Sequence, residues 1–200
     1  MKALIIFAKN PEAVRVKTRL AVTIGNEAAL EVYESLMEHT RTIARQIDCA
    51  RLVFLDGGVS EGNSWDINNF QMYAQMGNDL GERMSNAFDE CFNRGFGKVI
   101  IIGTDCPELT GEVIKDAFKC LESSDYVIGP ATDGGYYLLG MKRASPWLFQ
   151  GMTWSHDSVC DETINRTRNK GFTLTMLPTL SDIDTEADYL SYIAAQGSRP

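Results

Sequence analysis

The sequence predicts an α/β fold, a three-layer α/β/α sandwich with a mostly parallel, partly mixed central sheet. Up to residue 130, short aliphatic runs alternate with amphipathic helical patterns, which is typical of βαβ units with right-handed crossovers. After that point the alternation stops. Strand patterns at residues 125–129 and 136–141 lie too close together for a helical crossover, so the sheet is expected to become mixed there.

Hydrophobic periodicity predicts the elements of the first half. Continuous apolar runs predict strands at residues 2–8, 51–55, 70–76 and 99–102. Helices are expected at residues 26–47, 80–93 and 110–122, the last with Thr110 as its cap. Asn10 and Pro11 end the first strand, and an irregular basic loop is expected to follow.

The second half is predicted in the same way. Strands are expected at residues 125–129, 136–141 and 172–177, and helices at residues 156–169 and 185–195. Ser155 is the predicted cap of the helix at 156–169. Because no repeat, low-complexity tract or linker interrupts the chain, residues 1–200 are predicted to form a single domain.

Composition excludes several classes of protein. Hydrophobic residues make up 44% of the chain and charged residues 23%, which is typical of a globular protein. The net charge of −8 argues against a nucleic-acid partner. No apolar run approaches the roughly 20 residues of a membrane span, and residues 1–8 are too short for a signal peptide, so a cytoplasmic protein is expected. The five scattered cysteines show no zinc spacing and are expected to be free buried thiols.

The segment that follows the first strand is basic within an acidic chain. Residues 1–20 carry five cations against the single acid Glu12. In α/β proteins this position often binds phosphates, and Lys17 and Arg19 are suited to neutralise phosphate oxygens. The segment lacks the GxGxxG and GxxxxGK[ST] patterns, so neither dinucleotide nor P-loop chemistry is indicated. A solvated loop is the alternative interpretation.

Asp105 follows the aliphatic strand at 99–102, at the edge of the sheet where ligands bind in open α/β folds. A carboxylate there is suited to hold Mg²⁺ or Mn²⁺, which prefer oxygen ligands. The other interpretation is that Asp105 fixes the turn before Pro107 or caps the next helix. The strand alone leaves both open.

Three further segments carry candidate site residues. Asp79 has the position of a helix cap, and the first turn, which contains Gly81, could face an anion. Asp133 precedes two glycines that permit either a tight turn or close approach to a ligand. Asp182 and Asp184 precede the last helix and either cap it or bring a second carboxylate toward Asp105.

Taken in order, six segments resemble the GT-A-type nucleotide-diphospho-sugar transferase superfamily and, within it, a glycosyltransferase-like family of bacterial and archaeal proteins. The matched patterns are FAKxPxxGxVKTRLA, GxDLGERM, IGTDCPxL, GPAxDGGYYLxG, WS and DIDT. They lie at residues 7–21, 77–84, 102–109, 129–140, 154–155 and 182–185 and span nearly the whole chain. Val14 stands where that family usually has glycine, so the first loop is expected to take a different path.

The resemblance implies a GT-A-like fold with a Rossmann-like nucleotide-binding half, and a role for each candidate residue. The implied nucleotide-binding residues are Phe7, Ala8, Lys9, Lys17, Arg19, Asp79 and Gly81. The implied ligands of a divalent metal, Mg²⁺ or Mn²⁺, are Asp105, Asp182 and Asp184. Asp133 would be the general base for an acceptor hydroxyl. Gly134, Gly135, Tyr136 and Trp154 would line the sugar or acceptor pocket.

Together these features predict a metal-dependent transferase that uses a nucleotide-activated donor. Its expected partners are a nucleotide sugar or nucleoside triphosphate and a small-molecule acceptor, with no membrane span. Glycosyl transfer is preferred, because the first loop lacks the Gly-rich sequence usual in nucleotidyltransferases. The alternatives are a guanylyl- or cytidylyl-type nucleotidyltransferase, which would release pyrophosphate, and a non-catalytic nucleotide-binding protein. The base, sugar, acceptor and oligomeric state are left open.

Overall fold

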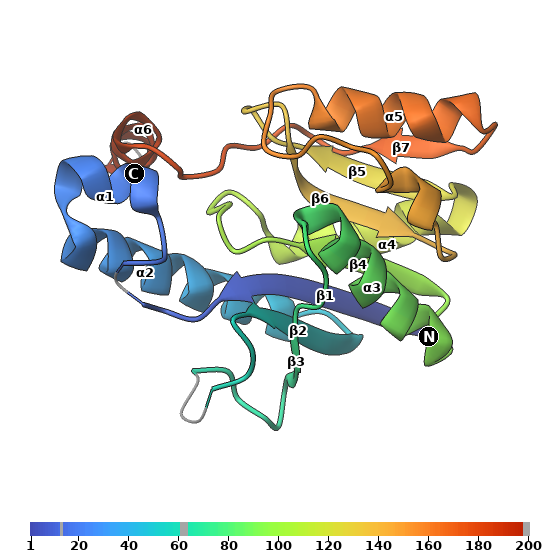
Figure 1. The fold of residues 1–200 in the computed structure, drawn as a ribbon, viewed down its shortest axis with the longest axis horizontal. Coiled ribbons are helices and arrows are strands. Elements are labelled where there is room, and N and C mark those ends of the chain that lie inside the picture. Colours follow the sequence, from blue (N-terminus) through green and yellow to red (C-terminus); the bar gives the residue numbers. More distant parts are fainter. Residues whose placement is uncertain (13, 61–63, 198–200) are drawn as a thin grey trace.

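The computed structural model describes residues 1–12, 14–60 and 64–197, so residue 13 of the first loop lies outside it (Figure 1). Its sheet has seven strands in the order β3-β2-β1-β4-β6-β5-β7. The strands are β1 (Lys2–Lys9), β2 (Ala50–Asp56), β3 (Gln71–Ala74), β4 (Lys98–Ile102), β5 (Tyr126–Pro130), β6 (Tyr136–Met141) and β7 (Leu174–Met176). The predicted α/β class is confirmed.

The sheet becomes mixed where the sequence predicts. Strands β1 to β4 are mutually parallel, whereas β6 runs antiparallel to both of its neighbours, β4 and β5. β7 is parallel to β5. Every strand except β6 therefore ends at the same edge of the sheet, and β6 begins there. The loops that follow β1, β2, β4 and β5 meet at this carboxyl edge.

Helices cover both faces of the sheet. They are α1 (Thr18–Ile24), α2 (Asn26–Arg45), α3 (Leu80–Asn93), α4 (Gly111–Ser123), the 3₁₀ turn η1 (Pro146–Leu148), α5 (Val159–Asn169) and α6 (Glu186–Gly197). The apolar faces of α2 and α4 pack on one side of the sheet, and those of α3 and α5 pack on the other. Along β1, Leu4 and Ile6 face the first layer while Ala3 and Ile5 face the second, as strand alternation requires.

A third, smaller core joins α1 to the C-terminal segment. Leu20, Ala29, Leu36 and Ile183 are buried together there. In Figure 1, α1 and α6 lie next to each other at one end of the molecule, and contacts join the two helices. This small core brings the end of the first loop against the segment that precedes α6.

Two predicted elements differ in the structure. Residues 18–24 form α1 instead of continuing as an irregular loop, with Leu20 as the buried residue. Helix α5 begins at Val159 and not at 156, and Ser155 adopts a left-handed φ of 65° instead of capping it. The turn at Gly134 packs against the Asp157 backbone, which keeps residues 155–158 out of the helix.

Val14, where the resembled family usually has glycine, does not take the left-handed conformation that a β-branched residue disfavours. Among the residues that the structure describes, the non-glycine residues with positive φ are Lys17 and Ser155, so Val14 does not adopt that conformation. Val14 is exposed. The left-handed turn falls at Lys17 instead, directly before α1.

No helix within the described ranges is long and apolar enough to cross a membrane. All five cysteines are free, three of them buried and two partly buried.

Candidate functional site

The carboxyl edge of the sheet contains a cleft of about 650 Å³. Its walls come from the loops that follow β1, β4 and β5, from the first turns of α3, and from the segments that precede α5 and α6. Most of the predicted site residues line it, namely Phe7, Ala8, Lys9, Lys17, Arg19, Asp105, Asp133, Gly135, Tyr136, Trp154, Asp182 and Asp184. Asp79, Gly81 and Gly134 lie outside this lining.

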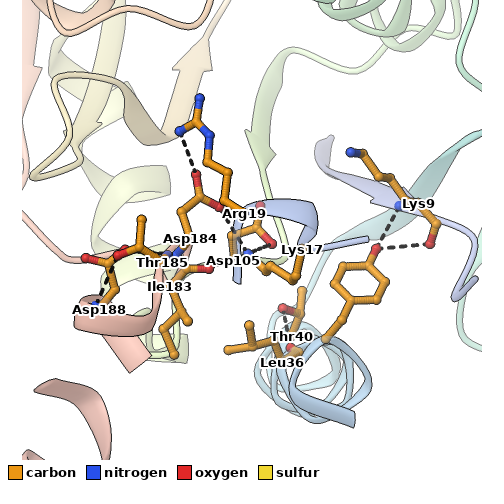
Figure 2. A network of polar contacts seen from close by, with 11 residues as sticks. Lys9, Lys17, Arg19, Leu36, Thr40, Asp105, Ile183, Asp184, Thr185 and Asp188 are labelled. Atoms are coloured by element: carbon orange, nitrogen blue, oxygen red, sulfur yellow. Dashed lines mark hydrogen bonds and ion pairs between the residues drawn. The ribbon is translucent and has the colours of Figure 1, made fainter. Parts of the chain in front are cut away.

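Lys17 is the centre of the polar contacts in the cleft (Figure 2). Its ammonium lies 2.6 Å from Asp105 Oδ1 and 3.4 Å from Asp184 Oδ1, and it donates to the Ile183 carbonyl at 2.5 Å. The Lys17 side chain is only 3% exposed, whereas the Asp105 and Asp184 side chains are 46% and 47% exposed. A buried cation therefore joins two half-exposed carboxylates, one from the loop after β4 and one from the segment before α6.

The backbone supports the same arrangement. The amide of Ile183 donates to the carbonyl oxygen of Asp105 at 3.0 Å, which joins the loop after β4 to the segment before α6. The Asp188 carboxylate accepts from the amides of Asp184 and Thr185 and fixes the turn that leads into α6. The backbone of Asp184 is thus fixed by Asp188, and the Asp184 carboxylate contacts Lys17 instead of capping the helix.

Asp182 is the most perturbed carboxyl group of the cleft. Burial, with the nearby charges of Asp105 and Asp133, raises its pKa to about 7. Its Oδ1 is buried and has no hydrogen-bond partner. A buried oxygen of this kind is costly unless a proton or a cation compensates it.

The oxygen atoms in the cleft suit a hard divalent cation. Asp105 and Asp184 each direct one carboxylate oxygen toward the Lys17 ammonium, and Asp182 supplies a buried oxygen without a hydrogen-bond partner. Within the part of the chain that the structure describes, no three His, Cys, Asp or Glu side chains already stand together as metal ligands. The donor chemistry fits Mg²⁺ or Mn²⁺, while Lys17 occupies the point where two of the carboxylates meet.

The predicted base, Asp133, lies in the turn between β5 and β6. Its Oδ1 accepts from the amide of Gly135 at 2.9 Å, which fixes the side chain at the mouth of the cleft. Gly134 adopts a φ of 89°, and a β-carbon there would lie 1.9 Å from the Asp157 carbonyl oxygen. Gly134 therefore shapes the turn, whereas Gly135 lines the cleft.

The first loop presents its backbone at the opposite wall. Tyr33 Oη accepts from the Lys9 amide at 2.8 Å and donates to the Lys9 carbonyl at 3.0 Å, so both backbone groups of Lys9 are bonded. Burial raises the pKa of Tyr33 to about 12, which keeps this hydroxyl protonated. Arg19 is 72% exposed, and its guanidinium lies 3.9 Å from Asp184 Oδ2.

The start of α3 has a structural role at the other end of the cleft. Asp79 caps this helix, accepting from the Glu82 amide at 2.8 Å. Gly81 packs so closely on Trp154 that a β-carbon would lie 2.5 Å from the indole ring. The indole wall of the cleft therefore depends on Gly81.

The cleft also contains polar residues that the sequence does not predict as site residues, among them the paired residues Asp56 and Arg83. Arg83 Nη1 lies 3.0 Å from Asp56 Oδ1, which pairs α3 with the end of β2. Asp56 was detectable as a carboxylate at a predicted strand end. Nothing in the sequence pattern places Arg83 beside it.

Residues 39–156 match a protein family described as "uncharacterized protein conserved in bacteria", DUF2064. Comparison with curated proteins finds no match. Among solved structures, a protein from Desulfovibrio desulfuricans G20, provisionally named a nucleotide-diphospho-sugar transferase, is 30% identical to this chain. It superposes with a TM-score of 0.91, and the match covers 98% of this chain and 88% of that one.

Two more distant structures share the fold. Rv0371c from Mycobacterium tuberculosis H37Rv, solved in complex with manganese, is 12% identical with a TM-score of 0.59, covering 97% of this chain and 98% of that one. The 2-C-methyl-D-erythritol 4-phosphate cytidylyltransferase from Thermus thermophilus is also 12% identical, with a TM-score of 0.56 and 98% of each chain covered.

Proposed function

Because this chain belongs to the DUF2064 family and has the fold of the nucleotide-diphospho-sugar transferases, we propose that it is a metal-dependent transferase with a nucleotide-activated donor. The preferred reaction is glycosyl transfer from a nucleotide sugar to a hydroxyl group of a small-molecule acceptor. A provisional transferase name on a 30% identical structure, with cytidylyltransferase chemistry on the same fold, supports this class.

The observation that carries the proposal is that the carboxylates of Asp105 and Asp184 converge on one cation, the Lys17 ammonium. Both carboxylates stand at the carboxyl edge of the sheet, where open α/β folds bind ligands. With Asp182 they would hold Mg²⁺ or Mn²⁺. When bound, such a metal would neutralise the charge on the diphosphate that leaves. The manganese complex of Rv0371c, on the same fold, supports this choice of metal.

The cations on the rim of the cleft would hold the diphosphate. Lys9 and Arg19 are exposed at the wall formed by the first loop. A guanidinium offers paired donors to phosphate oxygens. The backbone beside them, locked by Tyr33, would face the nucleoside.

Asp133 would accept the proton of the acceptor. In this reaction the acceptor oxygen bonds to the anomeric carbon, the bond from that carbon to the diphosphate oxygen breaks, and the acceptor proton passes to Asp133. Gly135, Tyr136 and Trp154 form the adjacent wall, and aromatic rings there suit the face of a sugar. The hydrogen bond from the Gly135 amide keeps the carboxylate oriented.

The charges near Asp133 favour glycosyl over nucleotidyl transfer. Asp133 and Asp157, which line the cleft together with Tyr136 and Trp154, are carboxyl groups outside the proposed metal ligands. Arg83, the nearby guanidinium, is already paired with Asp56. A phosphorylated acceptor, which nucleotidyl transfer requires, would meet this negative charge, whereas a neutral hydroxyl would not. Nucleotidyl transfer remains the second candidate because the cytidylyltransferase shares the fold.

The two reactions release different products. The protein is incubated with Mn²⁺ and either nucleoside triphosphates or nucleotide sugars, and pyrophosphate and nucleoside diphosphate are measured separately. We expect nucleoside diphosphate from a nucleotide sugar. Pyrophosphate alone would reject glycosyl transfer in favour of the second candidate. Nucleotide binding without either product would support a non-catalytic binding protein.

A further inference from the structure

The ammonium of Lys17 is surrounded by oxygen atoms of the protein. It donates hydrogen bonds to the Ile183 carbonyl and to Asp184, and it forms an ion pair with Asp105 at 2.6 Å. In this conformation Lys17, the residue predicted to bind phosphate, pairs with oxygen atoms of the protein. A phosphate can bind Lys17 only if one of the carboxylates releases it.

The chain on either side of Lys17 holds the ammonium in this position. Val16 is buried in the core beneath α2 and α4, and Leu20 is buried in the small core between α1 and the segment before α6. Lys17 itself has a φ of 47°, a left-handed conformation that carries an energetic cost for a residue with a β-carbon. Because buried residues on both sides fix this strained conformation, the position of the Lys17 ammonium is determined by the fold.

The oxygens that Lys17 contacts are those that a divalent metal would use. The ammonium meets Oδ1 of Asp105 and Oδ1 of Asp184, two of the three proposed ligands. An ammonium and a divalent ion cannot both approach the same pair of oxygens at contact distance, because like charges repel. Lys17 therefore competes with the metal when the diphosphate is absent.

We propose that Lys17 is an internal counter-ion for Asp105 and Asp184. When metal and diphosphate bind together, its side chain moves and its ammonium pairs with the diphosphate instead of these carboxylates. This inference rests on the proposed function and adds a coupling to it. In the free protein Lys17 holds the two carboxylates together and keeps metal affinity low. In the loaded protein the metal replaces Lys17 at the carboxylates, and the released ammonium pairs with the phosphates.

The test measures metal binding without turnover. Binding of Mn²⁺ alone is followed by the electron paramagnetic resonance signal of free Mn²⁺ for the wild type, Lys17→Met and Lys17→Gln. Both variants lose the positive charge. Lys17→Gln is the milder substitution, because glutamine keeps an N–H donor for Asp105. Removing a unit charge at contact distance is expected to tighten Mn²⁺ binding by about tenfold or more in both variants. Lys115→Met, which removes an exposed cation on α4, is the matched control and should change the affinity less than about twofold.

A second measurement examines the phosphate side. Calorimetric titration with inorganic pyrophosphate is performed in EDTA and again with saturating Mn²⁺. Lys17→Gln should lose affinity for pyrophosphate, by about tenfold, only when Mn²⁺ is present, because only then is the wild-type ammonium released. An equal loss in EDTA would show that Lys17 binds phosphate without the metal, and would overturn the exchange.

The outcomes separate this inference from the proposed function. If the wild type binds Mn²⁺ and neither substitution tightens that binding, Lys17 is not a competitor, and the inference fails while the metal-dependent transferase stands. If no Mn²⁺ binds to any of the proteins, with or without pyrophosphate, the metal in the proposed function fails as well. Lys17 would then be the permanent cation of a metal-independent site.

Discussion

At the scale of single residues, three carboxyl groups in the cleft have different surroundings. Asp105 and Asp184 are half-exposed and share a buried ammonium. Asp182 is mostly buried, has an oxygen without a partner, and has a raised pKa. The two half-exposed groups are thus accessible to a ligand, whereas burial of Asp182 favours its protonated form when no cation is bound.

Asp105→Asn tests the metal assignment. The substitution removes one anionic ligand and preserves the size of the side chain. We expect Mn²⁺-dependent binding of nucleoside diphosphates to weaken by about tenfold or more, measured by thermal shift with and without Mn²⁺. Asp116→Asn, at an exposed position on α4, is the matched control. Unchanged Mn²⁺ dependence in Asp105→Asn would remove Asp105 from the site.

Asp182→Asn tests the raised pKa. In the folded protein Asp182 has a pKa of about 7 against an ordinary value of 3.8. The folded state therefore binds more protons between these values, and the free energy of unfolding falls as the pH rises from 5 to 8. The substitution should abolish between about 1 and 4 kcal/mol of that fall, since each pKa unit corresponds to about 1.4 kcal/mol.

Urea denaturation in EDTA at pH 5 and pH 8 measures this difference. The wild type should lose stability between the two pH values by more than the variant does. Parallel profiles would mean that Asp182 is ionised in the folded protein across this range.

At the scale of elements, turns decide where helices begin near the cleft. The turn between β5 and β6 packs Gly134 against the Asp157 backbone, and the Gly134 carbonyl accepts from the Cys160 amide at 2.9 Å. This contact fixes where α5 begins and brings residues 154–156 to the cleft. The first turn of α3 packs Gly81 on Trp154 in a similar way. Two glycines therefore shape the wall proposed for the acceptor.

Gly134→Ala and Gly151→Ala form a matched pair. Both glycines have positive φ, 89° and 64° respectively. A β-carbon at Gly134 would collide with the Asp157 carbonyl oxygen, whereas one at Gly151 has nothing within 4 Å. We expect Gly151→Ala to cost about 1–2 kcal/mol of unfolding free energy from backbone strain alone, and Gly134→Ala to cost more than about 3 kcal/mol. Equal losses in urea denaturation would contradict the collision.

At the scale of the whole molecule, the sheet interleaves distant parts of the chain. β6 lies between β4 and β5, and β7, from the last third of the chain, pairs with β5. The cleft takes residues from β1 through to the segment before α6. Because the strands of one sheet and the walls of one cleft come from the whole length, we propose that the chain folds as one cooperative unit.

Thermal unfolding tests this unit. We expect a single calorimetric transition whose enthalpy equals the van't Hoff enthalpy, with the same midpoint by tryptophan fluorescence and by far-ultraviolet circular dichroism. Separate midpoints would indicate that the third core of α1 and α6 unfolds independently of the sheet.

Strands and helices were predictable to different degrees. All seven strands occur where apolar runs predict them, but the edge strands β3 and β7 are shorter than predicted, because each has a single neighbouring strand. Helix α3 has its predicted bounds, since its cap Asp79 and its apolar face are local features. Helix α1 was not predicted because it has seven residues with Leu20 as the buried one, so it shows no helical hydrophobic periodicity.

The sequence by itself determined the α/β class, the point where the sheet becomes mixed, and the strand end that carries Asp105, because each depends on local periodicity and spacing. Only the tertiary structure decided that Lys17 faces Asp105 and Asp184. Lys17 and Asp184 lie 167 positions apart in the sequence, and their contact depends on how α1 and α6 pack. A pattern of charges shows which groups can pair. Which of them do pair is fixed by the burial of the hydrophobic residues beside them.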